Sequence, residues 1–408
     1  MTTLYLYDDT RARAFEPFAS TRPASEMVAG TMLIRDRWHH ALQPSDVQFI
    51  AGRRHEHFDE PGARAATGMI PAGSIIALAR CAPAVPADPS KTARRAATCS
   101  MWRCGAELAA IRTKEPIDVA AFADGTMMLD ELYAGTGAIG TLDGWWLNEV
   151  WDFIRYLPEQ LAADLAAPSL PTGSRPTGAT ILGEGTVTVA ADAVIEPQVV
   201  FDATAGAIFV GAGSHVRAFT RLIGPCYIGR EVQVMGGDIG GSSIGDVCKV
   251  RGELSSTIVV GHSNKGHDGF VGHSYLGRWV NLGAGTITSN LKNTYGTVAL
   301  WTPSGVRDSG LQFLGTMFGD HVKTGIGLQL STGTVLGAGA NVYGNMPPKA
   351  VSPFSWGDAP PYAVYRADKF IETAARMMSR RHVELTDRAR RHLAAAHDGR
   401  WTAETGKA

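Results

Sequence analysis

The sequence predicts an α/β domain, then a parallel β-helix of hexapeptide repeats, then C-terminal helices. Three observations support this order. Short β-like and helical segments alternate up to about residue 167, as in α/β layer structures. Aliphatic residues then recur every six positions, which is neither the helical period nor that of a simple strand. Helical spacing returns after residue 346.

The first 167 residues alternate between two kinds of segment. TTLYLY, DVQFIAG and SIIALAR are typical of strands, whereas residues 25–42 and 144–157 are predicted to be helical. Pro158 is expected to restart the chain after the second helical segment. One face of that helix would be apolar and packed against a core, with Trp146, Val150, Phe153, Ile154 and Leu157 on it.

Residues 168–178 are rich in Pro, Gly and Ser and predict a linker. The expected domains are therefore residues 1–167 and 179–346, with a tail at 347–408. A chain of 408 residues is long enough for two separate cores. In the tail, helical spacing is accompanied by Thr386 as an expected N-cap.

The repeat has a period of six residues and pairs aliphatic residues with glycine, as in Ile228-Gly229 and Leu336-Gly337. Three such faces would use about 18 residues per coil, so roughly 170 residues predict on the order of eight or nine coils. Flat faces tend to pair with copies of themselves, and a homotrimer is expected. The six-residue series are Val210, Val216, Leu222, Ile228, Val234 and Phe318, Thr324, Leu330, Leu336, Val342.

The composition points away from large charged partners. The chain has 38 basic and 39 acidic residues and a net charge of -1, so its overall field would attract neither nucleic acid nor an anionic membrane. No signal peptide or long apolar span is evident. The five cysteines are scattered without paired spacing, which favours a reducing compartment. A cytoplasmic protein is therefore expected.

One polar stretch interrupts the repeat. The six-residue count breaks between Val260 and Leu276, where His262, His267 and His273 occur among glycines and hydrophobic residues. Polar residues at such a break predict a loop or a cleft.

The segment NKGHDGFVGHSYLGRWVNLGAGTITSN resembles the acetyltransferase part of the bacterial bifunctional N-acetylglucosamine-1-phosphate uridyltransferase/glucosamine-1-phosphate acetyltransferase. The chain resembles still more closely a family of sugar nucleotidyltransferases related to that enzyme. The further motifs of that resemblance are PPK…FSWG, from Pro347 to Gly357, and DD…R…TRP, from Asp8 to Pro23. The resemblance implies a left-handed β-helix and a shortened, nucleotidyltransferase-like first domain.

The resemblance also implies a reaction and its site. His267 matches the general base, and histidine titrates near neutral pH, as a base accepting a proton from an attacking amine should. Asn281 and Asn290 match sugar-binding residues, and Ala284 matches a position beside coenzyme A. With Gly285, Ala284 would bring backbone N–H groups close to the thioester oxygen. The expected co-substrate is acetyl-CoA.

Further substrate contacts are expected beside these residues. Lys265 and Arg251 are candidates for a sugar phosphate, because charged hydrogen bonds to phosphate are strong. Phe270 stands where the family has tyrosine, and Asn290 and Lys292 belong to a segment that replaces the family's NYDG. The expected acceptor is an amino sugar phosphate or a nucleotide sugar.

A metal site is the alternative for the same stretch. His262 and His267 are five residues apart, as are two zinc ligands in the β-helix type of carbonic anhydrase. A catalytic zinc ion needs three protein ligands and an open position. Either His273 or His215 could be the third ligand, but His273 is too near in sequence to match that pattern. The prediction is therefore no metal, with a zinc hydratase as an alternative.

The first domain lacks the Gly-rich loop of ordinary sugar nucleotidyltransferases. What remains is Asp8, Asp9, Arg11 and Arg22. The acidic pair could bind Mg²⁺ and the arginines a phosphate. Three alternatives to the acyltransferase thus stay open: nucleotidyl transfer with the β-helix as a scaffold, the zinc hydratase, and a trimeric binding module without catalysis.

Overall fold

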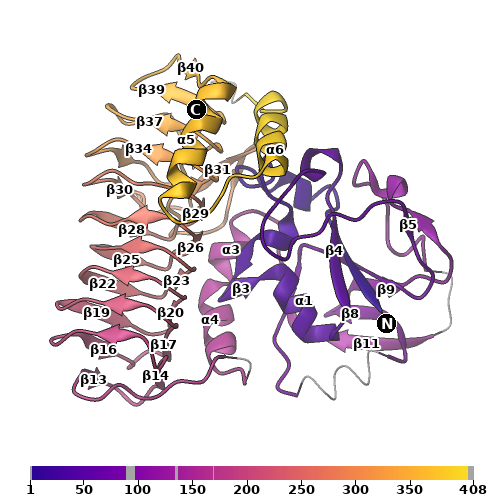
Figure 1. Cartoon of the computed structure of the whole chain (residues 1–408), viewed down its shortest axis with the longest axis horizontal. Coiled ribbons are helices and arrows are strands. Elements are labelled where there is room, and N and C mark those ends of the chain that lie inside the picture. Colours follow the sequence, from indigo (N-terminus) through magenta and orange to yellow (C-terminus); the bar gives the residue numbers. More distant parts are fainter. Residues whose placement is uncertain (1, 89–96, 134–136, 169, 403–408) are drawn as a thin grey trace.

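The computed structural model describes residues 2–88, 97–133, 137–168 and 170–402. Figure 1 shows a stack of β-coils beside a mixed α/β part, with the C-terminal helices over the upper end of the stack. The α/β part is built around a six-stranded sheet in the order β11 (Ala138–Leu142), β8 (Cys99–Cys104), β9 (Glu107–Arg112), β6 (Ile75–Leu78), β1 (Thr3–Tyr7), β4 (Asp46–Ile50).

Strand β1 lies between β4 and β6 and is parallel to both. Successive side chains of β1 point to opposite faces of the sheet, as in any β-strand. Leu4 and Leu6 join a core shared with helices and with the β-helix, whereas Tyr5 and Tyr7 join a second core on the other face. The expected strands in this region are confirmed.

The expected helices are shorter than predicted. Only α1 (Ile34–Leu42) forms within residues 25–42. Gly30 has a φ of +63° and separates β2 (Val28–Ala29) from β3 (Met32–Leu33), which form a hairpin. In residues 144–157, β12 (Gly144–Trp146) pairs with β7 (Cys81–Pro83), and helix begins only at α3 (Asp152–Arg155), followed by α4 (Leu157–Leu165). Pro158 lies in the first turn of α4, as expected. The smaller elements are η1 (Ala12–Ala14), η2 (Ala24–Glu26), η3 (Arg53–His55), η4 (Val119–Phe122), β5 (Met69–Ile70) and β10 (Ile117–Asp118).

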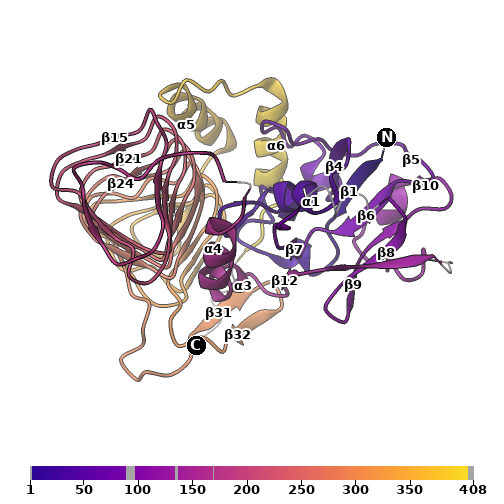
Figure 2. The ribbon, with the colours of Figure 1, turned by 90° about the horizontal axis from the view of Figure 1, so that it is seen from below.

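The second part is a left-handed parallel β-helix with a triangular section (Figure 2). One face has nine strands: β14 (Val187–Val189), β17 (Ile208–Val210), β20 (Cys226–Ile228), β23 (Ser243–Ile244), β26 (Ile258–Gly261), β29 (Tyr275–Arg278), β33 (Met317–Phe318), β36 (Val335–Leu336) and β38 (Ala350–Val351).

A second face has six strands: β13 (Thr180–Leu182), β16 (Val200–Asp202), β19 (Thr220–Ile223), β22 (Gly237–Gly240), β25 (Glu253–Ser255) and β28 (Phe270–Gly272). The third face has five strands: β15 (Val194–Ile195), β18 (His215–Val216), β21 (Gln233–Val234), β24 (Lys249–Val250) and β27 (Asn264–Lys265). The upper coils add β30 (Ile287–Thr288), β35 (Gln329–Leu330), β34 (Lys323–Thr324), β37 (Asn341–Val342), β39 (Ser355–Gly357) and β40 (Ala363–Val364).

The hexapeptide prediction is confirmed. Every member of both six-residue series is buried inside the coils, and nine strands on one face agree with the expected eight or nine coils. The division of the chain at residues 168–178 stays a prediction.

The expected loop at the polar stretch is wrong. Ile258 of β26 pairs directly with Tyr275 of β29, so the stretch forms one regular, slightly shorter coil. The excursion comes one coil later, between Tyr275 and its next partner Met317. It carries the hairpin of β31 (Ala299–Thr302) and β32 (Gly305–Asp308), which packs against the α/β part.

The nine-stranded face packs on the α/β part. The Tyr275 hydroxyl accepts a hydrogen bond from Val28 N at 2.8 Å and donates one to Val28 O at 3.1 Å. Its ring contacts Phe18, with centroids 4.5 Å apart. Helices α5 (Ala367–Ser379) and α6 (Asp387–Asp398) cover one corner of the upper coils (Figure 2). Thr386 caps α6 through Ala389 N, as predicted. Among the described residues, no helix combines the length and apolar character needed to cross a membrane.

Candidate functional site

The three histidines of the polar stretch lie at three different corners of one coil. His262 lies between β26 and β27, His267 between β27 and β28, and His273 between β28 and β29. Consecutive histidines of the stretch, five or six residues apart, are thus separated by one face of the triangular coil. The part of the chain that the structure describes contains no cluster of three His, Cys, Asp or Glu placed to hold a metal ion. His215 is instead paired with Glu196 at 2.7 Å. The zinc hydratase alternative therefore finds no support within one chain.

His267 occupies the outer corner between the five- and six-stranded faces. It is exposed, and its imidazole makes no hydrogen bond within the described ranges. Gly285 N donates to Asp268 O at 3.1 Å, which places Ala284 beside His267 in the next coil. The N–H of Ala284 has no hydrogen-bond partner among described residues. A free base and a free backbone donor thus lie at the same corner.

Asn281 lies on the five-stranded face, in line with β27. It pairs with Asn264 of the preceding coil, and its Oδ1 accepts a hydrogen bond from Asn264 Nδ2 at 2.8 Å. The chain runs from Asn264 to His267 and from Asn281 to Ala284 in parallel. Asn281 is therefore on the face that leads to the His267 corner.

The side chains of Phe270 and Asn290 lie close together beside Gly272, the last residue of β28. A Cβ atom on Gly272 would come within 2.3 Å of Phe270 Cζ and 2.8 Å of Asn290 Nδ2. The amide of Asn290 is also hydrogen-bonded to His273 Nδ1 at 2.9 Å. The structure thus brings the side chains of Phe270 and Asn290 together, and Phe270 begins β28 three residues after His267.

The predicted phosphate ligands differ in accessibility. Lys265 is buried, and its amine donates to the carbonyl oxygens of Arg251 and His267 at 2.6 and 3.0 Å. Burial lowers the pKa of Lys265 to about 8. Arg251 is half-exposed and pairs with Asp268 at 2.9 Å. Lys292 is partly exposed, two residues after Asn290. Arg251 and Lys292 are therefore the reachable cations.

Two cavities open at the carboxyl ends of β1 and β4, of about 190 and 360 Å³. They share Ala51, Gly52 and Arg53, and the smaller one is also lined by Asp8 and Arg54. In open α/β sheets, ligands bind at the carboxyl ends of parallel strands. Arg53 is exposed and makes no ion pair within the described chain, so its charge is available to a ligand.

The Asp8-Asp9 pair offers little to Mg²⁺. Asp9 Oδ2 accepts from Arg80 at 2.7 Å, and Asp9 Oδ1 accepts from Ala12 N at 2.9 Å. Asp8 Oδ2 accepts from Ala24 N at 3.0 Å, so only Asp8 Oδ1 lacks a partner. Mg²⁺ sites are built from several oxygen ligands. As placed, the pair does not fit that ion.

Asp8 leads to a prediction about stability. Burial raises the pKa of its carboxyl group from 3.8 to about 7. Since the folded state holds this proton more tightly, the group's contribution to the free energy of unfolding falls as pH rises from about 4 to about 7. Asp8→Asn keeps an acceptor for Ala24 N. It is expected to stabilise the protein by about 1–3 kcal/mol at pH 8 and to have little effect at pH 4, measured by urea unfolding. An effect independent of pH would contradict the assignment.

Arg11 and Arg22 do not lie together. Arg11 is exposed and donates to Asn148 Oδ1 at 3.0 Å. Arg22 is buried, pairs with Glu60 at 2.7 Å, and lies 3.2 Å from Asp320.

Glu60 also pairs with Arg278 at 2.6 Å, whose backbone N donates to Asp320 Oδ1 at 2.7 Å. This network borders a cavity of about 490 Å³ between the α/β part, the β-helix and α6. The sequence alone does not predict this network, because its residues are far apart in the chain. The TRP motif, which contains Arg22, is the one sequence feature that pointed to it.

Comparisons with known proteins show which proteins this chain is similar to. Residues 4–169 match a family model described as sugar nucleotidyl transferase. A bifunctional sugar-1-phosphate nucleotidylyltransferase/acetyltransferase of Sulfurisphaera tokodaii is 29% identical over 133 residues, covering 33% of this chain and 28% of the relative. The bifunctional protein GlmU of Koribacter versatilis is 28% identical over 200 residues, covering 42% and 38%. The chain spans well under half the length of these relatives.

Solved structures overlap with about half of the chain. AntD, an N-acyltransferase from Bacillus cereus, has 15% identity and a TM-score of 0.21, covering 50% of this chain and 91% of its own. The polysialic acid O-acetyltransferase OatWY has 13% identity and a TM-score of 0.22, covering 46% and 87%. The family-model match covers residues 4–169, the α/β part, and shows that this part is similar to sugar nucleotidyl transferases.

Proposed function

We propose that this protein is a transferase of sugar-nucleotide metabolism that moves an acyl group from an acyl-CoA thioester, most simply acetyl-CoA, to an amino sugar phosphate or amino nucleotide sugar. One observation carries the proposal. The free imidazole of His267 and the unpartnered N–H of Ala284 lie at the same exposed corner, in successive coils.

These two groups match the needs of the reaction. The acceptor amine attacks the thioester carbonyl, forming a C–N bond, and His267 takes the proton that the nitrogen loses. The negative charge that develops on the carbonyl oxygen would be stabilised by the Ala284 N–H. Collapse of the tetrahedral intermediate breaks the C–S bond, and the coenzyme leaves as a thiol after receiving the proton. Arg251 and Lys292 are the cations that could hold the acceptor's phosphate.

The proposed assembly is a homotrimer. Phe219 and Ile326 lie along the corner that carries His267, and they are 77% and 81% exposed. Apolar side chains so exposed on one edge favour cover by another molecule. A neighbouring β-helix would close the open side of the corner and form a groove for the coenzyme.

The test is thiol release from acetyl-CoA by the full chain, with a panel of hexosamine phosphates and amino nucleotide sugars as acceptors. We expect one acceptor to support release and to become N-acetylated, which mass spectrometry of the product would show. If every acceptor leaves the thioester intact, the acyltransferase proposal fails.

Nucleotidyl transfer by the α/β part is the second candidate. It is favoured by the family match and by the cavities at the ends of β1 and β4. Arg53 supplies a free positive charge there, although the Gly-rich loop is missing. Incubation with a sugar 1-phosphate and each nucleoside triphosphate is expected to release pyrophosphate. Arg53→Ala should reduce that release while leaving thiol release unchanged.

A further inference from the structure

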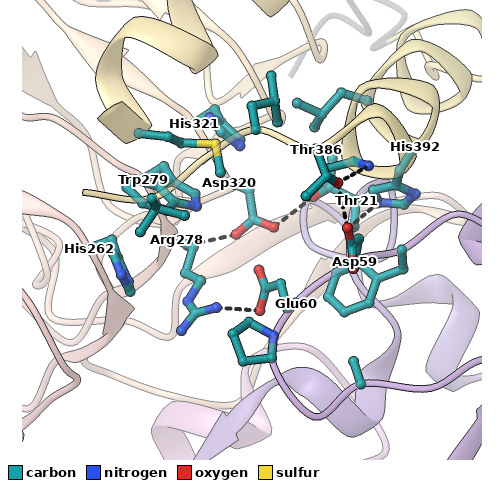
Figure 3. A pocket seen from close by; sticks show the side chains of 18 of the residues that line it. Thr21, Asp59, Glu60, His262, Arg278, Trp279, Asp320, His321, Thr386 and His392 are labelled. Atoms are coloured by element: carbon teal, nitrogen blue, oxygen red, sulfur yellow. Dashed lines mark hydrogen bonds and ion pairs between the residues drawn. The ribbon is translucent and has the colours of Figure 1, made fainter. Parts of the chain in front are cut away.

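The 490 Å³ cavity lies where the three parts of the chain meet (Figure 3). Its walls are the 58–63 loop of the α/β part, one corner of the β-helix, and α6 with the residues before it. A volume of 300–1,000 Å³ is typical of small-molecule sites. The cavity is separate from the His267 corner, because His262 and not His267 borders it.

The β-helix wall is a column of aromatic corner residues. His262, Trp279 and His321 take equivalent corner positions in successive coils, with φ values of 55°, 64° and 63°. Glu231 and Val247 have the same left-handed conformation at this corner in the two coils below, with φ values of 55° and 60°, so it belongs to the corner geometry of the repeat. The rings of His262 and Trp279 are 4.3 Å apart, and Trp279 and His321 are stacked at 6.3 Å. Phe58 lies on the opposite wall, in the 58–63 loop.

The imidazoles of His262 and His321 make no hydrogen bond within the described residues, and Nδ1 of each ring is enclosed by protein. His321 is only 6% exposed. Nε2 of each ring is therefore the atom that a ligand in the cavity could reach, and a hydrogen bond to it would stabilise the complex.

The histidines are neutral at physiological pH. Burial, with a smaller effect of Arg278, lowers the pKa of His262 to about 4, and burial lowers the pKa of His321 and His392 as well. A neutral imidazole has one donor and one acceptor. The ring wall thus offers both kinds of hydrogen bond.

The charges around the cavity disfavour phosphate. Glu60 and Asp320 are engaged with Arg22 and Arg278. Two further carboxylates, Asp59 and Glu384, line the cavity and leave it with a negative balance. A cation would in turn lie beside Arg278, so an uncharged ligand fits best.

We propose that this cavity binds an uncharged heteroaromatic ligand of nucleoside size. Its ring would lie among Phe58, Trp279 and the two corner histidines, and its ring atoms would pair with imidazole nitrogens. The site is a binding site additional to the transferase chemistry proposed above and does not depend on it.

Calorimetric titration of the full chain with adenosine, guanosine, cytidine and uridine tests the proposal. At least one nucleoside is expected to bind. Two variants should each weaken it: Ala389→Phe, which fills the cavity from α6, and His321→Phe, which keeps the ring and removes both nitrogens. A loss of about tenfold is expected, as for one hydrogen bond in a buried site. Thermal melting checks that both variants fold.

Arg53→Ala is the matched control, because Arg53 lies at the strand-end cavities that would take a nucleotide. It should leave nucleoside binding unchanged, and the matching nucleoside triphosphate should bind the central cavity less well than the nucleoside. The proposal is overturned if no nucleoside binds at millimolar concentration, if both cavity variants bind as the parent does, or if only Arg53→Ala abolishes binding.

Discussion

Replacing His267 with alanine is expected to slow thiol release from acetyl-CoA by a factor of about a hundred or more, as for loss of a general base. The side chain is exposed and has no hydrogen bond in the described chain, so its removal should not change the melting temperature. Hydroxylamine, which attacks thioesters without strong base assistance, should be acetylated at nearly the same rate by both proteins. The readout is thiol release against acceptor concentration.

His215→Ala is the matched control. His215 is another partly exposed histidine of the five-stranded face, but it is paired with Glu196 and lies three coils below. Its replacement should leave thiol release unchanged. Equal rates for the His267→Ala variant and the parent would refute the role of His267. Equal losses in both variants would indicate a structural effect.

The β-helix could be predicted from the sequence because every coil repeats the same pattern of one buried residue in each six. Val210, Leu222 and Val234 are buried for the same reason, at separations of twelve residues, which is two repeats, so periodicity alone locates them. The helix predicted over residues 25–42 shows the limit of that approach, because only Ile34–Leu42 is α-helical. There Gly30 turns the chain into a hairpin, and tertiary contacts, not periodicity, decide its conformation.

The candidate site was harder to predict than the fold. His262, His267 and His273 look clustered in the sequence, yet one triangular coil separates them onto three corners. Conversely, Arg22, Glu60 and Asp320 are far apart in the chain and meet in one network. The network forms only because the β-helix packs on the α/β part, so no local sequence pattern could have predicted it.

Arg22→Met is expected to lower the free energy of unfolding by about 3–5 kcal/mol, as when one partner of a buried ion pair is removed. Arg22 is 2% exposed and donates to both carboxylate oxygens of Glu60, at 3.0 and 2.7 Å. Without its guanidinium, Glu60 and Asp320 would face each other with Arg278 alone between them. Urea unfolding near neutral pH measures the loss. The surface pair of Arg64 and Asp46 is a control: Arg64→Met should cost less than about 1 kcal/mol.

The pH dependence of the stability loss in Arg22→Met shows whether the charge on Glu60 causes that loss. Burial alone would raise the pKa of Glu60, but Arg22 and Arg278 outweigh it and hold the value at about 2, below the ordinary 4.5. A depressed pKa means that the carboxylate stabilises the fold above pH 4.5 and loses this contribution as pH falls toward 2. The difference between parent and Arg22→Met should therefore be largest at neutral pH and shrink below pH 4.5. A difference that stays constant down to pH 3 would mean that packing, and not the charge on Glu60, makes Arg22 important.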